Sequence, residues 1–226
     1  METNWSVQQI SFRDVHPWLL KRHYAKRIPP VSYAFGAFLD KSLIGVVTYG
    51  TPVSSPLREG VCGRQYSDYV IELNRLCCES KKNLAGFLIS KSLKLIPKPK
   101  IIVSFADTAQ GHIGYVYQAT NFLYIGLSAK RTDWKIKGEE HLHGATIADR
   151  FRGVQNRSQA LLEKYGDDFY LEDRPRKHRY VIFIGSKKQK KNMRESLKYK
   201  VEKYPKGETK KYNANAEIDT QMLLIS

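Results

Sequence analysis

The chain has 226 residues, and its 42% hydrophobic content with 14 Tyr, 9 Phe and 3 Trp excludes a wholly disordered protein. Its 38 Lys and Arg exceed 22 Asp and Glu, and the resulting net charge of +16 favours a polyanionic partner. No apolar run approaches the ~18 residues of a membrane span, and residues 1–10 lack a signal-peptide pattern. Three cysteines, two of them adjacent, predict neither a disulfide framework nor a zinc site. We therefore expect a cytoplasmic protein with no membrane partner.

The first half of the chain predicts strands, a short helix and one amphipathic helix. In chain order these are a strand at 5–12, a helix capped by Asp14 and ended by Pro29 and Pro30, hairpin strands at 34–39 and 43–49, a loop at 51–63, a strand at 69–77, and a helix from Asn83 to Pro97.

The second half continues the alternation of strands and helices. Its predicted elements are a buried parallel strand at 101–105, a helix at 111–120, a strand at 122–126, a polar helix at 148–165, a strand at 180–184, and a basic helix or tail from Ser186. This order predicts the α/β (α+β) class, with a mixed, partly parallel sheet flanked by helices.

A basic C-terminal extension is predicted to follow the folded domain. We expect a catalytic domain at 1–185 and an extension at 186–226. Between Lys187 and Lys211 there are eleven basic residues and three acids, so this segment holds half of the net charge. Such a run indicates contact with nucleic acid, and the alternative is a segment that is merely solvated.

Chemistry is predicted where the buried strand at 101–105 meets the following helix, because ligands settle at the carboxyl ends of strands in open sheets. Residues 108–121 are polar and rich in glycine for a helix that should pack on a sheet. Gly111 and Gly114 would let backbone N–H groups face a ligand, while Asp107 offers a base and Tyr117 a hydroxyl acid. The alternative is that Asp107 caps the helix and Tyr117 only packs.

Several blocks of the sequence resemble one known family. They are Arg75 within Ile71 to Leu76, residues 102–107 leading into 111–114 and 116–121, and the closing Lys177-His178-Arg179-Tyr180. Over roughly residues 20–185 the chain is similar to the Mom family of bacteriophage DNA-modification proteins. This resemblance implies a GNAT-like acyltransferase fold. It also implies an activity that converts adenine in DNA to its N6-carbamoylmethyl derivative and shields phage DNA from host restriction.

The resemblance also implies a set of catalytic residues. They are Asp107 and Tyr117 first, followed by Arg75, Ser104, His23 and Tyr24. The exocyclic amine of adenine is a weak nucleophile, so a carboxylate that orients it and accepts its proton suits the reaction. Arg75 could instead be a structural ion-pair partner, and the pair His23 and Tyr24 could simply lie at the surface.

The donor of the transferred group is left open by the sequence. GNAT acetyltransferases carry a glycine-containing loop that cradles the pyrophosphate of coenzyme A, and residues 77–86 do not match it. Use of acetyl-CoA is therefore in doubt, although Lys81 and Lys82 could still meet a phosphate. The donor is an unidentified acyl or aminoacyl compound.

Two further groups of residues suggest ligands. His141 and His143 would share one face of a strand and could bind a metal ion such as iron, with Asp149 or His112 as further ligands; the alternative is an exposed pair. Phosphate contacts with DNA are predicted for Arg174, Arg176, Lys177, His178, Arg179, Lys187, Lys188, Lys190 and Lys191. For residues 177–179 the alternative is an exposed basic turn.

The leading hypothesis is an enzyme that modifies adenine in double-stranded DNA. It must extrude its target base, and Tyr24, Tyr115 or Tyr124 could stack on that base. One alternative with the same fold is an acetyltransferase of a protein or a small amine. The other is a nucleic-acid-binding protein without catalytic activity.

Overall fold

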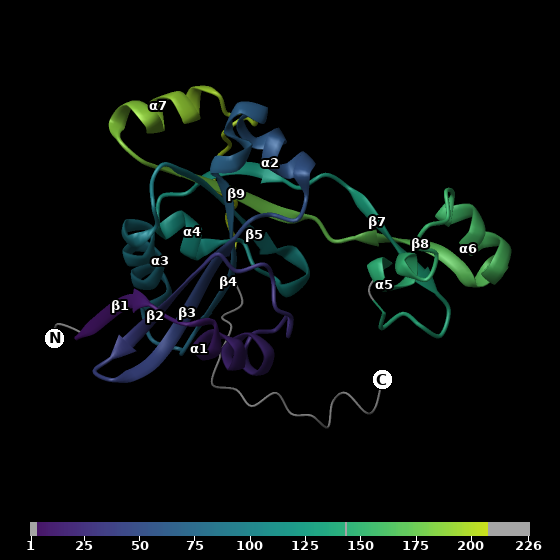
Figure 1. The fold of residues 1–226 in the computed structure, drawn as a ribbon, viewed down its shortest axis with the longest axis horizontal. Coiled ribbons are helices and arrows are strands. Elements are labelled where there is room, and N and C mark those ends of the chain that lie inside the picture. The colour runs from purple at the N-terminus through teal and green to yellow at the C-terminus, as the bar shows by residue number, and fades with distance from the viewer. Residues whose placement is uncertain (1–3, 143, 208–226) are drawn as a thin grey trace.

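The computed structural model describes residues 4–142 and 144–207, which form a central seven-stranded sheet with helices on both faces (Figure 1). The strand order is β1-β2-β3-β4-β5-β9-β6, and of these neighbours only β4 and β5 run parallel. The strands are β1 (Trp5–Gln9), β2 (Tyr33–Leu39), β3 (Ser42–Gly50), β4 (Val70–Cys78), β5 (Lys100–Asp107), β6 (Leu123–Leu127) and β9 (Lys177–Ile184). The predicted mixed, partly parallel sheet flanked by helices is confirmed.

The helices cover the two faces of this sheet unequally. They are α1 (Phe12–Pro17), which runs into a π-helix at Trp18–Arg22, α2 (Ser55–Cys62), α3 (Leu84–Leu95), α4 (Tyr115–Ala119) and α7 (Lys187–Glu195). The largest core cluster lies under α3 and α4, and two smaller clusters lie under α2 with α7 and under α1. Within the described ranges, no helix combines the length and the apolar character needed to cross a membrane.

Three local predictions were wrong, each because of a capping or turn residue. Ser11, and not Asp14, caps α1, because Asp14 occupies the third helical position and completes a capping box. The predicted loop at 51–63 contains α2, whose start is fixed by the side chain of Ser54 and by Pro56 in the first turn. The predicted helix at 111–120 is helical only over Tyr115–Ala119, since Gly111 and Gly114 adopt positive φ.

A small module that the sequence did not predict projects from the sheet (Figure 1). In the chain it lies between β6 and β9. It consists of β7 (Arg131–Ile136), α5 (Gly144–Asp149), α6 (Arg157–Tyr165) and β8 (Phe169–Arg174), and we call residues 131–174 the arm. β7 and β8 pair as an antiparallel ribbon around a core of Ile136, Ile147 and Leu161. The single helix predicted at 148–165 is wrong, because the chain turns at Gly153 and restarts with Asn156 as the cap of α6.

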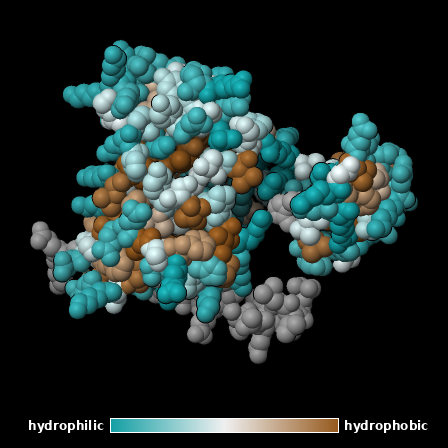
Figure 2. Space-filling model, in the orientation of Figure 1, coloured by the Kyte–Doolittle hydropathy of each residue, from teal (hydrophilic) through white to brown (hydrophobic). Residues whose placement is uncertain are grey.

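The basic segment after β9 packs onto the body of the protein. Its predicted helix is confirmed as α7, which begins with a capping box of Ser186 and Gln189. The side chain of Met193 is only 2% exposed, and the hydroxyl of Tyr204 donates to the carbonyl of Phe122 at 2.8 Å. Hydrophilic residues cover the outer surface of this helix (Figure 2). The domain boundary at residue 185 stays a prediction.

We expect Met193→Ala to lower the free energy of unfolding by about 2–5 kcal/mol, because it leaves a cavity beneath α7. Denaturant unfolding measures this change. The exposed Lys188→Ala on the same helix serves as the control and should leave the unfolding midpoint unchanged. Equal stability of the two variants would mean that α7 does not contribute to the core.

Candidate active site

A β-bulge in β4 determines which side chains of this strand face the site. Thr48 of β3 pairs with Arg75 while Tyr49 pairs with Leu73, so Asn74 is an extra residue in β4. Leu73 and Leu76 both join the core beneath α3. Because the bulge reverses the alternation, Glu72 and Arg75 share the opposite face of the strand.

The parallel pairing of β4 and β5 ends before either strand does. It joins Val70–Leu73 to Ile101–Ser104, and from there β4 continues to Cys78 and β5 to Asp107 without pairing to each other. At the last pair, the hydroxyl of Ser104 donates to the carbonyl of Leu73 at 2.9 Å. We call this divergence the fork, and it lies at the carboxyl end of two parallel strands, where α/β sheets bind ligands.

Tyr117 of α4 approaches the fork from the side of the large core. Its side chain is buried, and burial raises the pKa of the hydroxyl to about 12, an effect that the hydrogen bond with Ser104 partly opposes. At neutral pH the hydroxyl is therefore protonated. It can donate a proton or a hydrogen bond to a group placed in the fork.

His23 and Tyr24 reach the fork from the loop after the π-helix. Their rings stack with centroids 4.4 Å apart, and the rings of Tyr24 and His112 form a T-shaped pair with centroids 5.8 Å apart. Burial, together with the charge of Arg75 and the neighbouring His112, lowers the pKa of His23 to about 3. His23 is thus neutral at pH 7. Its Nδ1 accepts the backbone N–H of Ala25 at 3.0 Å, which places the ring proton on Nε2.

The bulge residue Asn74 holds this loop in place. Its amide donates to the carbonyl of Pro30 at 2.8 Å, and its carbonyl oxygen accepts from the hydroxyl of Thr48 at 2.6 Å. The loop lies so close to β3 that a Cβ on Gly50 would stand 1.9 Å from the Pro30 oxygen. The same backbone irregularity therefore aims Arg75 and fixes the loop of His23 and Tyr24.

Arg75 and Glu72 form the charged wall of the fork. Nη1 of Arg75 donates to the carbonyl of Asn74 at 2.7 Å, while its Nε is buried and has no hydrogen-bond partner among the described residues. Burial lowers the pKa of Arg75, and the nearby Tyr24 and Glu72 oppose this shift. Burial likewise raises the pKa of Glu72, against the charges of Arg75 and Lys177. No role was predicted for Glu72, whose signal in the sequence was a carboxylate between the apolar residues Ile71 and Leu73.

Asp107 ends β5 and uses its two carboxylate oxygens differently. Oδ1 accepts the N–H of Ala109 at 3.1 Å and so caps the following turn, as the structural alternative predicted. Oδ2 lies 3.2 Å from Nζ of Lys177. Asp107 also contributes, after burial, to the raised pKa of Tyr24, and it opposes the burial that lowers the pKa of His112. Asp107 is therefore both a cap and a charged group beside the two rings.

All six predicted catalytic residues border the fork or its entrance, and the structure adds three more residues to the site. Glu72 and His112 had no predicted catalytic role, and Lys177 was predicted only as a DNA contact. All nine are linked by the contacts and electrostatic interactions described above: His23, Tyr24, Glu72, Arg75, Ser104, Asp107, His112, Tyr117 and Lys177.

The four residues predicted to bind a cofactor have other contacts in this structure. Lys81 pairs with Glu79 at 3.5 Å in the turn before α3, which also contains Lys82. The N–H of Gly111 donates to the carbonyl of Thr108 at 2.9 Å. A Cβ on Gly114 would lie 2.4 Å from the ring of Tyr180, so this glycine is needed for packing. A cofactor role for these residues stays a prediction.

The alternation of β9 divides the predicted basic cluster between two faces. Lys177 and Arg179 share the face of Val181, whereas the Nδ1 of His178 on the other face hydrogen-bonds the hydroxyl of Tyr124 at 2.9 Å. Nε of Arg176 donates to the carbonyl of Ser128 at 2.6 Å. His178 and Arg176 are therefore engaged by the chain itself.

The remaining predicted groups differ in how accessible they are. Tyr24 is 37% exposed and Tyr115 66% exposed, whereas Tyr124 is buried and cannot stack on a base without rearrangement.

His141 is exposed and lies in a turn, so the predicted strand is wrong there, and His143 lies outside the described residues. Among the residues that the structure describes, no three His, Cys, Asp or Glu side chains are placed to hold a metal ion.

The model of the Mom protein family matches residues 4–206, so the chain belongs to this family. The chain is also 28% identical over 221 residues to the methylcarbamoylase Mom of Escherichia phage Mu, covering 89% of this chain and 86% of that protein. The resemblance drawn from the sequence is thus confirmed, and the match extends beyond residues 20–185 at both ends.

Solved acetyltransferases align more weakly. A GNAT-family acetyltransferase from Bacillus cereus shares 13% identity at a TM-score of 0.42, covering 80% of this chain and 99% of that chain. An N-acetyltransferase from Staphylococcus aureus shares 12% identity at a TM-score of 0.42, covering 80% of this chain and 98% of that chain. Membership of the Mom family rests on the sequence match.

We expect Glu72→Gln to raise the denaturant midpoint at neutral pH. Because burial raises the pKa of Glu72, its carboxyl group binds a proton more tightly in the folded protein than in the unfolded chain. Stability therefore falls as the pH rises from about 4.3, the ordinary pKa of glutamate, through the raised value.

Unfolding curves at pH 7 and near pH 3 check this prediction. The gain should vanish in acid, where the carboxyl is protonated in both states, and the exposed Glu163→Gln should change neither curve. A lower midpoint for Glu72→Gln at pH 7 would show instead that the ionised carboxylate stabilises the fold.

Proposed function

We propose that this protein is a transferase that modifies the N6 amine of adenine in double-stranded DNA, giving the carbamoylmethyl derivative or a related adduct. We also propose that the modification protects DNA from restriction. Membership of the Mom family and the relative named as a methylcarbamoylase support this proposal. The observation that carries it is the placement of the Asp107 carboxylate and the protonated Tyr117 hydroxyl around one fork.

Asp107 and Tyr117 suit the two proton movements of such a transfer. The lone pair of the adenine amine is delocalised into the ring, so a carboxylate that orients this amine and accepts its proton increases its reactivity. Lys177 at 3.2 Å keeps a positive charge beside the carboxylate. Tyr117 can supply a proton or a hydrogen bond to the donor, since burial keeps its hydroxyl protonated.

Arg75 and His23 offer donors to a second group in the fork. The buried Nε of Arg75 has no partner among the described residues, and a guanidinium suits a carboxylate or phosphate oxygen of the donor. His23 is neutral, and because its Nδ1 accepts the N–H of Ala25, its Nε2 carries the ring proton. Both side chains would therefore orient the donor molecule and not act as bases.

The target base must leave the duplex to reach this site, because its N6 group is paired inside DNA. Tyr24 lies beside Asp107 and is partly exposed, so it suits stacking on the extruded adenine. Tyr115 is more exposed, but no described contact places it beside Asp107.

We expect Asp107→Asn to keep the fold and DNA binding. The level of modified adenine should fall by about 10²–10⁴-fold, because the amide cannot accept the proton. The amide oxygen can still cap the turn at Ala109. Nucleosides from digested DNA of expressing cells, analysed by mass spectrometry, give the level of modified adenine.

The exposed Asp68→Asn is a matched control for this experiment and should retain wild-type levels of modification. Modified adenine at wild-type levels in Asp107→Asn would remove Asp107 from the mechanism. Unmodified nucleosides from well-expressed wild-type protein would contradict the proposed function itself.

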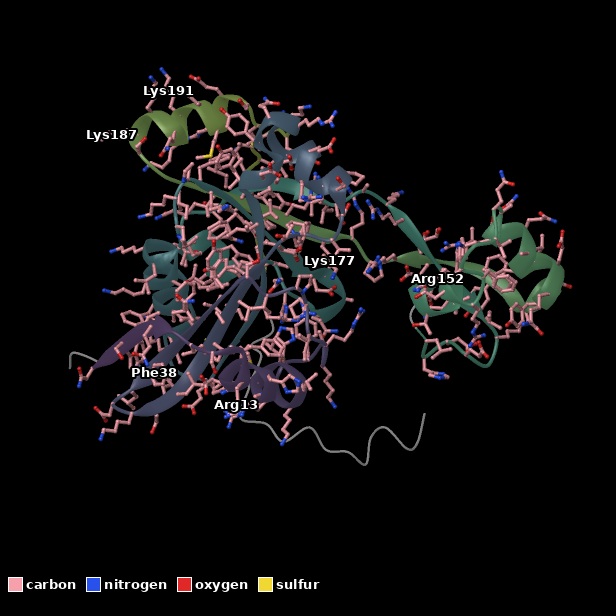
Figure 3. The ribbon with its side chains drawn as sticks, viewed as in Figure 1. Arg13, Phe38, Arg152, Lys177, Lys187 and Lys191 are labelled. Carbon is pink, nitrogen blue, oxygen red and sulfur yellow. The ribbon has the colours of Figure 1, made fainter. Side chains whose placement is uncertain are left out.

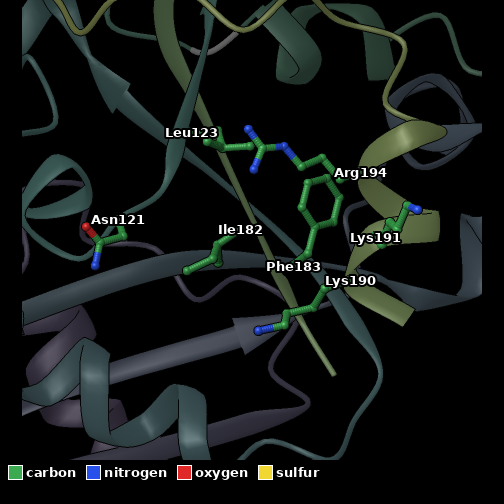
Figure 4. Close-up of a pocket in the computed structure, with 7 residues that line it drawn as sticks. All are labelled: Asn121, Leu123, Ile182, Phe183, Lys190, Lys191 and Arg194. Atoms are coloured by element: carbon green, nitrogen blue, oxygen red, sulfur yellow. The ribbon is translucent and has the colours of Figure 1, made fainter. Parts of the chain in front are cut away.

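α7 also supplies a positive surface for duplex DNA. Lys190, Lys191 and Arg194 surround a pocket of about 390 Å³ whose wall includes Ile182 and Phe183 of β9 (Figure 4). Lys187 and Lys191 extend from this helix at the end of the molecule opposite the arm (Figure 3). Truncation after Gly185 would also remove the buried Met193, so substitutions are the cleaner test of these charges.

We expect replacement of Lys187, Lys188, Lys190 and Lys191 by Gln to flatten the dependence of log affinity on log salt. Each phosphate contact contributes about 0.9 to this slope, so two to four contacts give a change of about 2 to 4. Fluorescence anisotropy with one duplex at several salt concentrations measures the slope. Lys137→Gln with Arg152→Gln on the arm is the control, and equal slopes in all three proteins would exclude α7 from the DNA interface.

A further inference from the structure

A groove of about 420 Å³ lies between the body of the protein and the base of the arm. The start of α2, Arg131 of β7 and Arg174 of β8 contribute to its lining. Phe105, Lys177 and Arg179 line it as well. We call this cavity the arm groove.

The charged side chains that line the arm groove are positive. They are Arg131, Arg174, Lys177 and Arg179, and none of the described residues in the lining is Asp or Glu. Arg131 and Arg174 stand directly opposite each other across the β7–β8 ribbon, a placement that destabilises the pair unless an anion separates the charges. Among the described residues, the carboxylate that pairs with Arg174 is that of Asp133, at 3.7 Å, and both side chains are partly exposed.

Arg179 is positioned by contacts that leave it incompletely satisfied. Its guanidinium stacks on the ring of Tyr199 at 4.2 Å, and one terminal nitrogen donates to the carbonyl of Ile125 at 3.0 Å. Its Nε is buried and has no hydrogen-bond partner in the described part of the chain. The stacking fixes a positive charge in the lining of the groove without neutralising it.

The arm groove leads to the fork through Lys177. The Nζ of this residue lies 3.2 Å from Asp107, so an anion beside Lys177 would be adjacent to the proposed catalytic carboxylate. The arm as a whole has eight Lys and Arg against nine Asp and Glu, and therefore offers no general attraction for DNA. The attraction is concentrated at the base of the arm.

We propose that the arm groove binds the sugar-phosphate backbone of the DNA strand that contains the target adenine, at a phosphate next to the extruded nucleotide. This inference rests on the proposed function and deepens it. Extrusion rotates a nucleotide about its backbone, so a grip on the adjacent phosphate determines where the base arrives. Arg131 and Arg174 form that grip, and Lys177 lies between the phosphate and Asp107.

The test removes the charge of one phosphate at a time. A duplex with a single mismatched adenine, which is easily extruded, is made with a neutral methylphosphonate at each position around that adenine in turn. Affinity is measured by fluorescence anisotropy for the wild type, for Arg131→Gln, and for Arg152→Gln on the outer arm. The side chain of Arg152 is 76% exposed, which makes it a control of equal charge.

We expect the wild type to lose about tenfold in affinity at one or two phosphates next to the mismatched adenine, the scale of one charge-assisted contact. Arg131→Gln should bind the unmodified duplex with a similar loss and a salt slope smaller by about 0.9. It should then show a clearly smaller further loss at the same methylphosphonate, because Arg174 alone remains to contact that phosphate. Arg152→Gln should behave as the wild type does.

Two outcomes would overturn the arm groove as the backbone site. One is a wild type that is insensitive to methylphosphonates near the adenine, and the other is an Arg131→Gln variant as sensitive as the wild type. Modified adenine that depends on Asp107 would in either case leave the proposed function intact. The expected interference pattern without any modified adenine would instead support the groove and contradict the proposed function.

Discussion

The early end of the pairing between β4 and β5 is the constraint on which the site depends. Hydrogen bonds join the two strands only as far as Leu73 and Ser104, and the unpaired remainders separate into the fork. A fully paired ladder would leave no opening between the strands. A bulge at Asn74 of β4 accompanies this separation. The bulge turns Arg75 to the face of Glu72, and the side chain of Asn74 hydrogen-bonds the loop after the π-helix. Backbone geometry therefore assembles side chains from segments that are far apart in the sequence.

Burial of ionisable side chains gives the fork an electrostatic cost. Burial lowers the pKa of Arg75 and of His23 and raises that of Glu72, so each of these groups is less favourable in its charged form than it would be in water. The cations Arg75 and Lys177 and the carboxylates of Glu72 and Asp107 limit this cost by facing one another. The neutral His23 and Tyr117 add hydrogen-bonding groups without adding charge.

Positive charge is distributed in two places that are separated by the length of β9. α7 follows the carboxyl end of this strand, and the arm groove adjoins its amino end at Lys177 (Figure 3). The arm has slightly more acids than bases, so it contributes arginines at its base but no general positive field. A long polyanion can meet both positive regions at once, because a strand of eight residues spans only about 26 Å, less than one turn of duplex DNA.

The sequence by itself determined the class of the sheet, most of its strands, the basic segment after β9, and the polar, glycine-rich segment after β5 that led to Asp107 and Tyr117. These features depend on local patterns of hydrophobicity, charge and turn residues, which can be read along the chain. Only the tertiary structure decided the role of Glu72, the division of the basic cluster by β9, and the arm groove. Each of these depends on a register shift, on strand alternation, or on segments far apart in the sequence, such as Arg131 and Tyr199. Such relations exist only once the strands have paired.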